Sequence, residues 1–487
     1  MKILVSGWLS VILDVAHERP SLLLLSRVIR FPRRSVDCAA SKCPFTQLAT
    51  SEGTSVPALS VRSSQPSLRP LVVAVLLAAA SAQAQGTPEA APAQPPRSEP
   101  SAVQPPAPPG KATPAKDSPV TVTAAPGRGI VVKTADDRFS LGLRARAQFR
   151  DTFSHSGDTD TNELQIRTLR LVVHGNVLAP ELRYNIQLAL GGGDFERDSS
   201  SPIFDAFLEY TKVRDLNIRV GQFFVPFDRA RTIREFALQF VDRQQVVREL
   251  SLDRDVGLML SSSNLFGLGD RLAYNLFLGE GAGRNRFGAQ TLGPLLVARL
   301  TLRPFGAFDD DQEGDLSREK RPRLAIGFAG ARNLATNRQN STYGTTFTVG
   351  TVDYTNAAVD IVFKYAGFSL LAEGLWRRAN VDALEGTTAA GAPVQEWTRS
   401  GYGYFVQAGM LVQPTLEVVG RWEQLHARGG TDPQFIQLAE TQGRQVAGGV
   451  NFYANGHALK LQSDYVYVFG HSGTPRHFVR LQVDASF

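Results

Sequence analysis

Three arginines at alternate positions have the spacing to form a row of anion contacts. Residues 139–150 read FSLGLRARAQFR. Arg144, Arg146 and Arg150 share one face of such a strand, because successive strand side chains point to opposite faces. A guanidinium group is a planar fork that donates two parallel hydrogen bonds to a phosphate-like anion. A row of weak contacts lets an anion enter a channel and leave it again, so the pattern predicts anion passage.

The end of the chain indicates which kind of sheet holds these arginines. Residues 477–487 alternate apolar and polar side chains, and the chain stops on Phe487. An apolar strand with a terminal aromatic residue is typical of the strand that closes an outer-membrane β-barrel. No run of 18 or more apolar residues follows residue 85, so we expect no transmembrane helix in the body of the chain.

Alternating segments and alternating links extend this prediction to the whole body. We expect sixteen antiparallel strands, at 139–150, 164–178, 182–193, 203–213, 216–224, 253–263, 270–280, 293–305, 321–333, 356–366, 367–378, 399–413, 414–426, 443–455, 456–470 and 474–487. Short links alternate with long polar ones such as 151–163 and 225–252, which is the barrel pattern. The link 303–323 is the exception, because it is long where a short turn is expected. The fold class is therefore all-β, a 16-stranded transmembrane barrel with a water-filled lumen.

Charge fixes the orientation of each strand in such a barrel. An arginine that faces lipid near the midplane costs about 2–4 kcal/mol, so the three arginines of 139–150 are predicted to face the lumen. The same rule places a basic set inward: Arg170, Arg183, Arg219, Arg299, Arg303, Lys364, Arg377, Arg421, Lys460 and Arg480. It also places an acidic set inward: Asp205, Glu209, Asp255, Asp360, Glu373, Glu417, Glu423, Asp464 and Asp484. A second interpretation stays open, in which the arginines pair with these carboxylates and brace the wall.

The N-terminal quarter does not read as a folded domain. Residues 67–84 contain an apolar run and a small-residue cleavage pattern that predict a signal peptide, and residues 1–66 are expected to precede the natural start. Residues 85–126 are rich in Pro and Ala and are expected to be a disordered periplasmic linker, with the barrel at 127–487. Both cysteines precede the linker. Beyond Ala84 the chain has 43 basic and 42 acidic residues, so any preference for anions must come from where the charges lie.

The stretch from Ile203 to Gly257 resembles the phosphate-selective porin O/P family. The residues that carry the resemblance are Asp205-Ala206-Phe207, Arg219-Val220-Gly221-Gln222-Phe223, Pro226-Phe227 and Arg254-Asp255-Val256-Gly257, together with Arg144, Arg146 and Phe487. The resemblance implies a homotrimeric channel in the bacterial outer membrane that passes small anions such as phosphate or polyphosphate. It implies anion contacts at Arg144, Arg146, Arg219 and Arg254, with Asp205 and Asp255 as orienting or counterbalancing groups. The family's inward loops suggest a constriction, although the segment 225–252 holds no lysine.

Several alternatives remain at this point. The apolar spacing of 225–252 suits a short helix, and the segment either enters the barrel or packs on its rim. A general diffusion porin, with aromatic contacts for sugars at Phe207, Phe223, Phe277 and Phe405, is the second functional candidate. We expect no enzyme and no cofactor, since the chain has neither G-x-S-x-G nor H-E-x-x-H. We expect no nucleic-acid partner, and Asp309-Asp310-Asp311 is interpreted as a solvated acidic loop rather than a metal site.

Overall fold

The computed structural model describes residues 119–194, 201–286, 293–388, 391–470 and 473–487. The chain divides into units of residues 1–109 and 110–487, and all described residues belong to the second unit. The expected leader, the signal peptide and nearly all of the expected linker lie outside the described residues. No helix in the described part of the chain is long and apolar enough to cross a bilayer.

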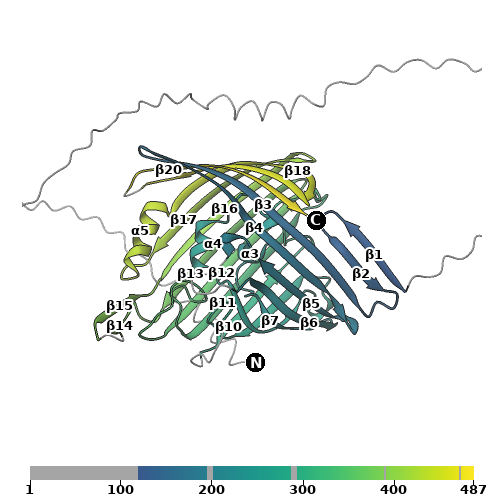
Figure 1. Ribbon diagram of the computed structural model, residues 1–487, viewed down its shortest axis with the longest axis horizontal. Helices are drawn as coiled ribbons and strands as arrows, with labels where there is room; N and C mark the ends of the chain where they lie inside the picture. The colour runs from purple at the N-terminus through teal and green to yellow at the C-terminus, as the bar shows by residue number, and fades with distance from the viewer. Residues whose placement is uncertain (1–118, 195–200, 287–292, 389–390, 471–472) are drawn as a thin grey trace, which may run out of the picture. The chain divides into compact units, whose positions relative to one another are not determined.

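Sixteen antiparallel strands close into one barrel, as predicted (Figure 1). They are β3 (Ser140–Ser156), β4 (Thr159–Val177), β5 (Ala179–Ala189), β6 (Ile203–Val213), β7 (Leu216–Phe224), β8 (Arg254–Ser262), β9 (Leu272–Gly279), β10 (Leu295–Leu302), β11 (Arg323–Thr336), β12 (Val352–Tyr365), β13 (Phe368–Ala379), β16 (Gly401–Gln413), β17 (Leu416–Ala427), β18 (Arg444–His457), β19 (Leu459–Val468) and β20 (Arg476–Ser486). The ring closes where β20 pairs with β3, with Val483 opposite Phe149. The C-terminal strand therefore has the closing role that its alternation predicts.

The outer face of the barrel is apolar and its inner face is charged. On β3, Leu143 and Phe149 are 44% and 50% exposed, whereas Arg146 and Arg150 are 7% and 5% exposed. Each predicted inward carboxylate on the later strands, from Asp360 to Asp484, is likewise buried. The predicted orientation is confirmed, and the apolar outer face matches the lipid that surrounds such a barrel.

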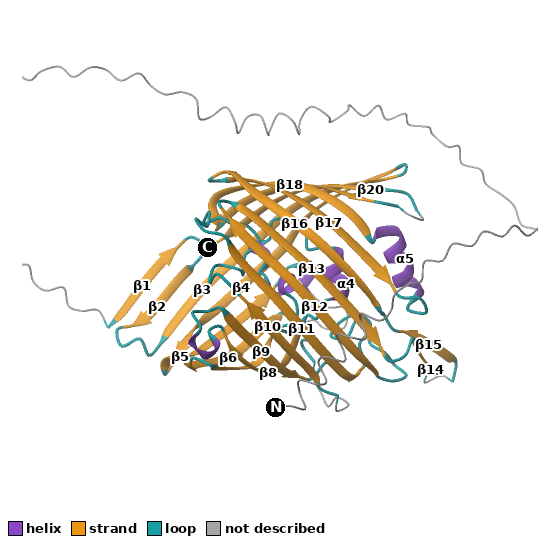
Figure 2. Cartoon of the chain, turned by 180° about the vertical axis from the view of Figure 1, so that it is seen from behind, coloured by secondary structure: helices purple, strands orange, loops and turns teal. Residues whose placement is uncertain are grey.

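Link lengths define two ends of the barrel. At the end that we call the turn end, β4 and β5 are joined by Leu178 alone and β12 and β13 by Ala366-Gly367. The long links gather at the opposite, loop end, where one link carries the hairpin of β14 (Ala383–Thr387) and β15 (Pro393–Trp397) and another carries α5 (Pro433–Gln442) (Figure 2).

The link expected at 151–163 is wrong. β3 and β4 continue to Ser156 and Thr159 and meet at a tight turn. The polar side chains there pair across the strands, with 2.6 Å between the hydroxyls of Ser154 and Thr161. A polar sequence thus forms a paired ribbon rather than a loop.

An N-terminal hairpin that the sequence did not predict lies beside β3 (Figure 1). It consists of β1 (Val120–Ala125), which falls at the end of the expected linker, and β2 (Gly129–Thr134). β20 pairs with β3 only from Arg146 onward, because the chain ends at Phe487. β2 pairs with the earlier part of the same β3 edge, at Ser140–Leu143. Gly129 makes this approach possible, because it has φ +72° and an added Cβ would lie 2.0 Å from the carbonyl oxygen of Leu143.

Candidate functional site

The segment between β7 and β8, residues 225–253, folds into the lumen. It contains the short helices α3 (Arg229–Thr232) and α4 (Gln245–Leu250) and a 3-10 turn at Glu235–Ala237, all inside the barrel ring (Figure 1). Its apolar side chains, including Val225, Phe227 and Ile233, form a buried cluster with lumen-facing wall residues such as Phe405. The loop therefore enters the barrel rather than packing on its rim.

Carboxylates of the barrel wall hold this inserted loop by its backbone. The Glu373 carboxylate accepts hydrogen bonds from the backbone N–H groups of Arg229 and Ala230, both at 3.0 Å. Asp464 accepts from the N–H of Val241 at 2.9 Å. Glu423 accepts from the N–H of Gln245 at 2.5 Å in the same way. Hydrogen bonds contribute about 0.5–1.5 kcal/mol each, and more where the partner is charged, so these contacts fix the path of the loop.

These wall contacts also explain why the expected helix is only partly formed. The apolar spacing predicts a helix through residues 233–241, yet only Glu235–Ala237 is helical there. The N–H groups of Gln239 and Val241 donate to the carboxylates of Glu313 and Asp464 instead of to helix carbonyls. Wall partners that are distant in sequence thus replace the local hydrogen bonds of a helix.

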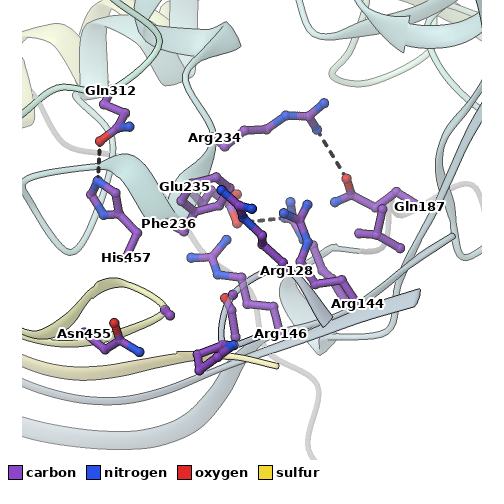
Figure 3. A pocket seen from close by; sticks show the side chains of 16 residues that line it. Arg128, Arg144, Arg146, Gln187, Arg234, Glu235, Phe236, Gln312, Asn455 and His457 are labelled. Atoms are coloured by element: carbon purple, nitrogen blue, oxygen red, sulfur yellow. Dashed lines mark hydrogen bonds and ion pairs between the residues drawn. The ribbon is translucent and has the colours of Figure 1, made fainter. Parts of the chain in front are cut away.

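Two cavities in series lie between the inserted loop and the first barrel strands. Cavity A, at the turn end, has a volume of about 450 Å³. Its charged lining consists of Arg128, Arg144, Arg146, Arg170, Arg234 and Glu235. The imidazole of His457 also lines it (Figure 3). Cavity B, toward the loop end, is smaller, with a volume of about 90 Å³. Its charged lining consists of Arg150, Arg167, Arg231, Arg243, Arg248, Glu235 and Asp242. Five arginines thus line each cavity, against two different carboxylates in total.

The arginines of cavity A differ in how firmly they are paired. The Nε atom of Arg146 lies 2.8 Å from Asp484, and Arg170 lies 2.9 Å from Asp194 and 2.8 Å from Glu235. Arg144 has no hydrogen bond or ion pair to another described residue, and its guanidinium carbon lies 5.9 Å from the ring centroid of Phe236. Arg144 and the exposed Arg128 are therefore the guanidinium groups of cavity A with the most capacity to bind a passing anion.

The two carboxylates of these cavities stay ionised. Burial opposes ionisation of Glu235, but Arg170 and Arg243 beside it hold the pKa of the carboxyl well below its usual range. Burial likewise opposes ionisation of Asp242, and Arg480 and Arg150 hold its pKa well below the usual range. Arg150 and Arg480 contact the Asp242 carboxylate at 2.9 and 2.7 Å. The ten arginines of the two cavities are thus accompanied by two carboxylates that are ionised at neutral pH.

A β-bulge adds Arg167, which the sequence reasoning missed. Alternation from Arg170 would place Arg167 on the lipid face, but the register between β3 and β4 shifts between Gln148 and Phe149. Beyond this shift Leu164 and Ile166 point outward, at 79% and 55% exposed, and Arg167 lines cavity B. An arginine that faces lipid is costly, so Arg167 on the outer face was the signal that the alternation of inward and outward side chains reverses here.

Of the two other arginines implied by the family resemblance, only Arg219 lines a cavity. Arg219 lines a third cavity, cavity C, of about 450 Å³ at the turn end, and its Nε atom lies 3.0 Å from Glu209. Arg254 lines none of the three cavities, because it is 1% exposed between the rings of Phe204 and Phe224.

The two orienting carboxylates also differ. Asp205 accepts from Arg254 at 2.7 Å and from Arg234 at 2.9 Å, so it contacts one of the arginines that the family resemblance names. Asp255 contacts no arginine within the described residues and accepts from the backbone N–H of Gly281 at 2.6 Å. Its carboxylate therefore fixes the loop after β9 rather than an arginine.

The description of Asp309-Asp310-Asp311 as a solvated loop is wrong for its central residue. Asp310 is 4% exposed and accepts hydrogen bonds from Arg229 and Arg303, each at 2.9 Å. The link 303–322 thus enters the lumen, where Asp310 forms ion pairs with buried arginines that would otherwise be unpaired.

The model of the family described as phosphate-selective porin O and P matches residues 139–477, which covers the barrel except for most of β20. The chain belongs to this family. It is an outer-membrane porin, and its channel is the lumen described above. No protein of curated function matches the chain.

Several solved structures are similar in fold to this porin. The outer membrane channel DcaP of Acinetobacter baumannii is 14% identical, with 73% of this chain and 99% of that chain covered and a TM-score of 0.46. A loop L8 deletion mutant of OmpT of Vibrio cholerae is 13% identical, with 72% and 100% covered and a TM-score of 0.45. OprB of Pseudomonas putida at high pH is 10% identical, with 72% and 95% covered and a TM-score of 0.46.

The phenylalanines considered for sugar contacts pack mostly into the protein, although Phe207 and Phe223 also line part of cavity C. Phe223 lies edge-to-face with Phe207 and Phe277, at centroid distances of 5.8 and 5.6 Å. Phe223, Phe277 and Phe405 are 1%, 3% and 1% exposed. These rings therefore offer no continuous stacking surface along the porin lumen.

Proposed function

We propose that this porin conducts small anions in preference to cations, and that phosphate-like anions are among its substrates. The observation that supports the proposal is the uneven charge of cavities A and B, where ten arginines stand against two carboxylates. A narrow passage lined by one sign of charge concentrates ions of the opposite sign. The family description points to phosphate among such anions.

We propose that Arg144, Arg146, Arg150 and Arg170 contact the passing anion, with Arg219 in the same role in cavity C. Each lines one of the cavities, and each except Arg144 also has a carboxylate partner that holds it in place. Arg254 and Asp255 take structural positions, so their effect on conduction would be indirect.

We also propose that the porin is a homotrimer in outer-membrane lipid. The family resemblance implies this state, and one similar structure, OmpT of Vibrio cholerae, is described as a trimer form. The mass of the detergent-solubilised porin, measured by analytical ultracentrifugation with correction for bound detergent, tests the proposal; a mass of one chain contradicts it.

The substitution Arg144→Gln tests the anion preference. A unit charge at about 4 Å interacts with a monovalent ion by about 1 kcal/mol in water, which corresponds to about a fivefold change in occupancy. We therefore expect the chloride-to-potassium permeability ratio, from zero-current potentials in planar bilayers, to fall by up to about fivefold. Arg428→Gln is the matched control, because Arg428 is exposed in a loop-end link and lines none of the three cavities.

The general diffusion porin makes a different prediction. If the arginines only brace the wall, Arg144→Gln leaves the permeability ratio at the value of the Arg428→Gln control. That result would refute an anion-contacting role for Arg144 and would favour passage without charge selection.

A further inference from the structure

One link at the turn end is built unlike most of its neighbours. Most links at this end have one or two residues, but residues 303–322 join β10 to β11 and turn into the lumen. Within the link, Asp310, Glu313 and Asp315 are 4%, 2% and 0% exposed. A link of this length on the short-turn side of a barrel needs a structural or functional reason.

The link is fixed to the wall and to the inserted loop. The Glu313 carboxylate accepts from the backbone N–H of Gln239 at 2.6 Å and from the side-chain amide of Gln407 at 2.7 Å. The Lys364 ammonium donates to the backbone oxygens of Asp309 and Gly314 at 2.6 and 2.8 Å. The link therefore meets the inserted loop within the lumen and is held by β12 and β16. Because these partners are buried, the link is a fixed partition rather than a loose flap.

Neighbouring residues of the link line different cavities. Gln312 lines cavity A and hydrogen bonds to His457 at 2.7 Å (Figure 3). Asp311, one residue earlier, lines cavity C. The link thus stands between two spaces of about 450 Å³ each.

Residues of the inserted loop line cavities A and C and also the smaller cavity B, which lies toward the loop end. Arg234 lines both cavity A and cavity C, whereas Glu235 lines both cavity A and cavity B. Arg234 and Glu235 are adjacent in the chain. The three cavities therefore converge on one dipeptide.

We propose that residues 304–322 form a septum that divides the turn-end half of the pore into two parallel arms, which join at Arg234 and Glu235. Arm A is cavity A, with its five arginines and one carboxylate. Arm C is cavity C, where phenyl rings and hydroxyl groups accompany the arginines. The proposal goes beyond anion preference and does not depend on its sign, since it concerns how many paths carry the current.

Cysteine modification on the two faces of the septum tests this proposal. Gln312→Cys and Asp311→Cys are made separately in a chain in which Cys38 and Cys43 are replaced by serine. A bulky uncharged methanethiosulfonate is added from the turn side while single-channel conductance is recorded. We expect each modification to lower conductance by about a third to two-thirds and to leave the channel open, because the other arm still conducts. Lys320→Cys, exposed in the same link and outside the three cavities, is the control.

Other results would overturn the proposal. Complete closure by modification at either position would show a single shared path. A loss at only one position, or at neither, would show that an arm carries no current. Each variant is compared with itself before and after the reagent, so an open channel before modification demonstrates that the variant has folded. Anion preference is measured separately, from the zero-current potential of the unmodified porin.

Discussion

The carboxylate of Asp242 offers a sharp distinction between arginines that attract anions and arginines that only brace the wall. It lies in the inserted loop, lines cavity B, and contacts Arg150 and Arg480 at 2.9 and 2.7 Å. Asp242→Asn keeps the size of the side chain and removes one of the two negative charges of that cavity. Both guanidinium groups keep other partners, since Arg150 also donates to Gln482 and Arg480 to Asp464.

Two effects of opposite kind follow from this substitution. Two hydrogen bonds between charged groups are weakened, at about 1.5–3 kcal/mol each, so docking of the loop should lose roughly 3 kcal/mol. At the same time the net positive charge of cavity B rises by one unit. At about 4 Å in water one charge is worth about 1 kcal/mol, so the chloride-to-potassium permeability ratio should rise by up to about fivefold.

Zero-current potentials at neutral pH measure the ratio, and hydrogen exchange of the loop amides measures the docking. Asp382→Asn is the matched control, because Asp382 is exposed before β14 and lines none of the three cavities. A variant with faster loop exchange but an unchanged or lower ratio would refute the reasoning, since it would show that the arginines of cavity B act only as braces.

Three further predictions concern the two carboxylates of these cavities and the N-terminal hairpin. Between pH 7 and pH 5 the anion preference should not change through Glu235 or Asp242, because neighbouring arginines hold both pKa values well below the usual range and neither group gains a proton there. The stability that these carboxylates contribute is complete above their unfolded pKa of about 4 and is lost progressively as pH falls from there through the lower folded values. The unfolding temperature should therefore be lower at pH 2 than at pH 5. Gly129→Ala should lower the unfolding temperature, because its φ of +72° costs an alanine about 1–2 kcal/mol and its Cβ would meet the carbonyl of Leu143. Gly456→Ala, also at positive φ but with open space around it, should lower it less.

The barrel was predictable from the sequence because one rule governs every strand. Alternation with period two fixes the strand, and the cost of a charge in lipid fixes which face is inside. Arg144, Arg146, Arg150 and Arg170 were therefore placed correctly without knowledge of their neighbours. The same rule failed at Arg167, where a single extra residue in β4 reverses the phase.

The interior of the pore was less predictable because its contacts are remote in sequence. Val241 is held by Asp464, 223 residues away, and no local pattern announces such a partner. Arg254 is an arginine like Arg144, but it is enclosed by the rings of Phe204 in β6 and Phe224 in β7. The sequence does not indicate this difference. The hairpin of β1 and β2 was missed because its pairing depends on an edge that exists only after β20 has ended at the barrel seam.

The sign of the zero-current potential of the unaltered porin in a KCl gradient across a planar bilayer tests the central claim most directly. Cavities A and B hold ten arginines and two carboxylates that are ionised at neutral pH. This arrangement predicts that chloride carries more current than potassium, and that phosphate competes with chloride. A potential of the opposite sign, with potassium the more permeant ion, would contradict the account.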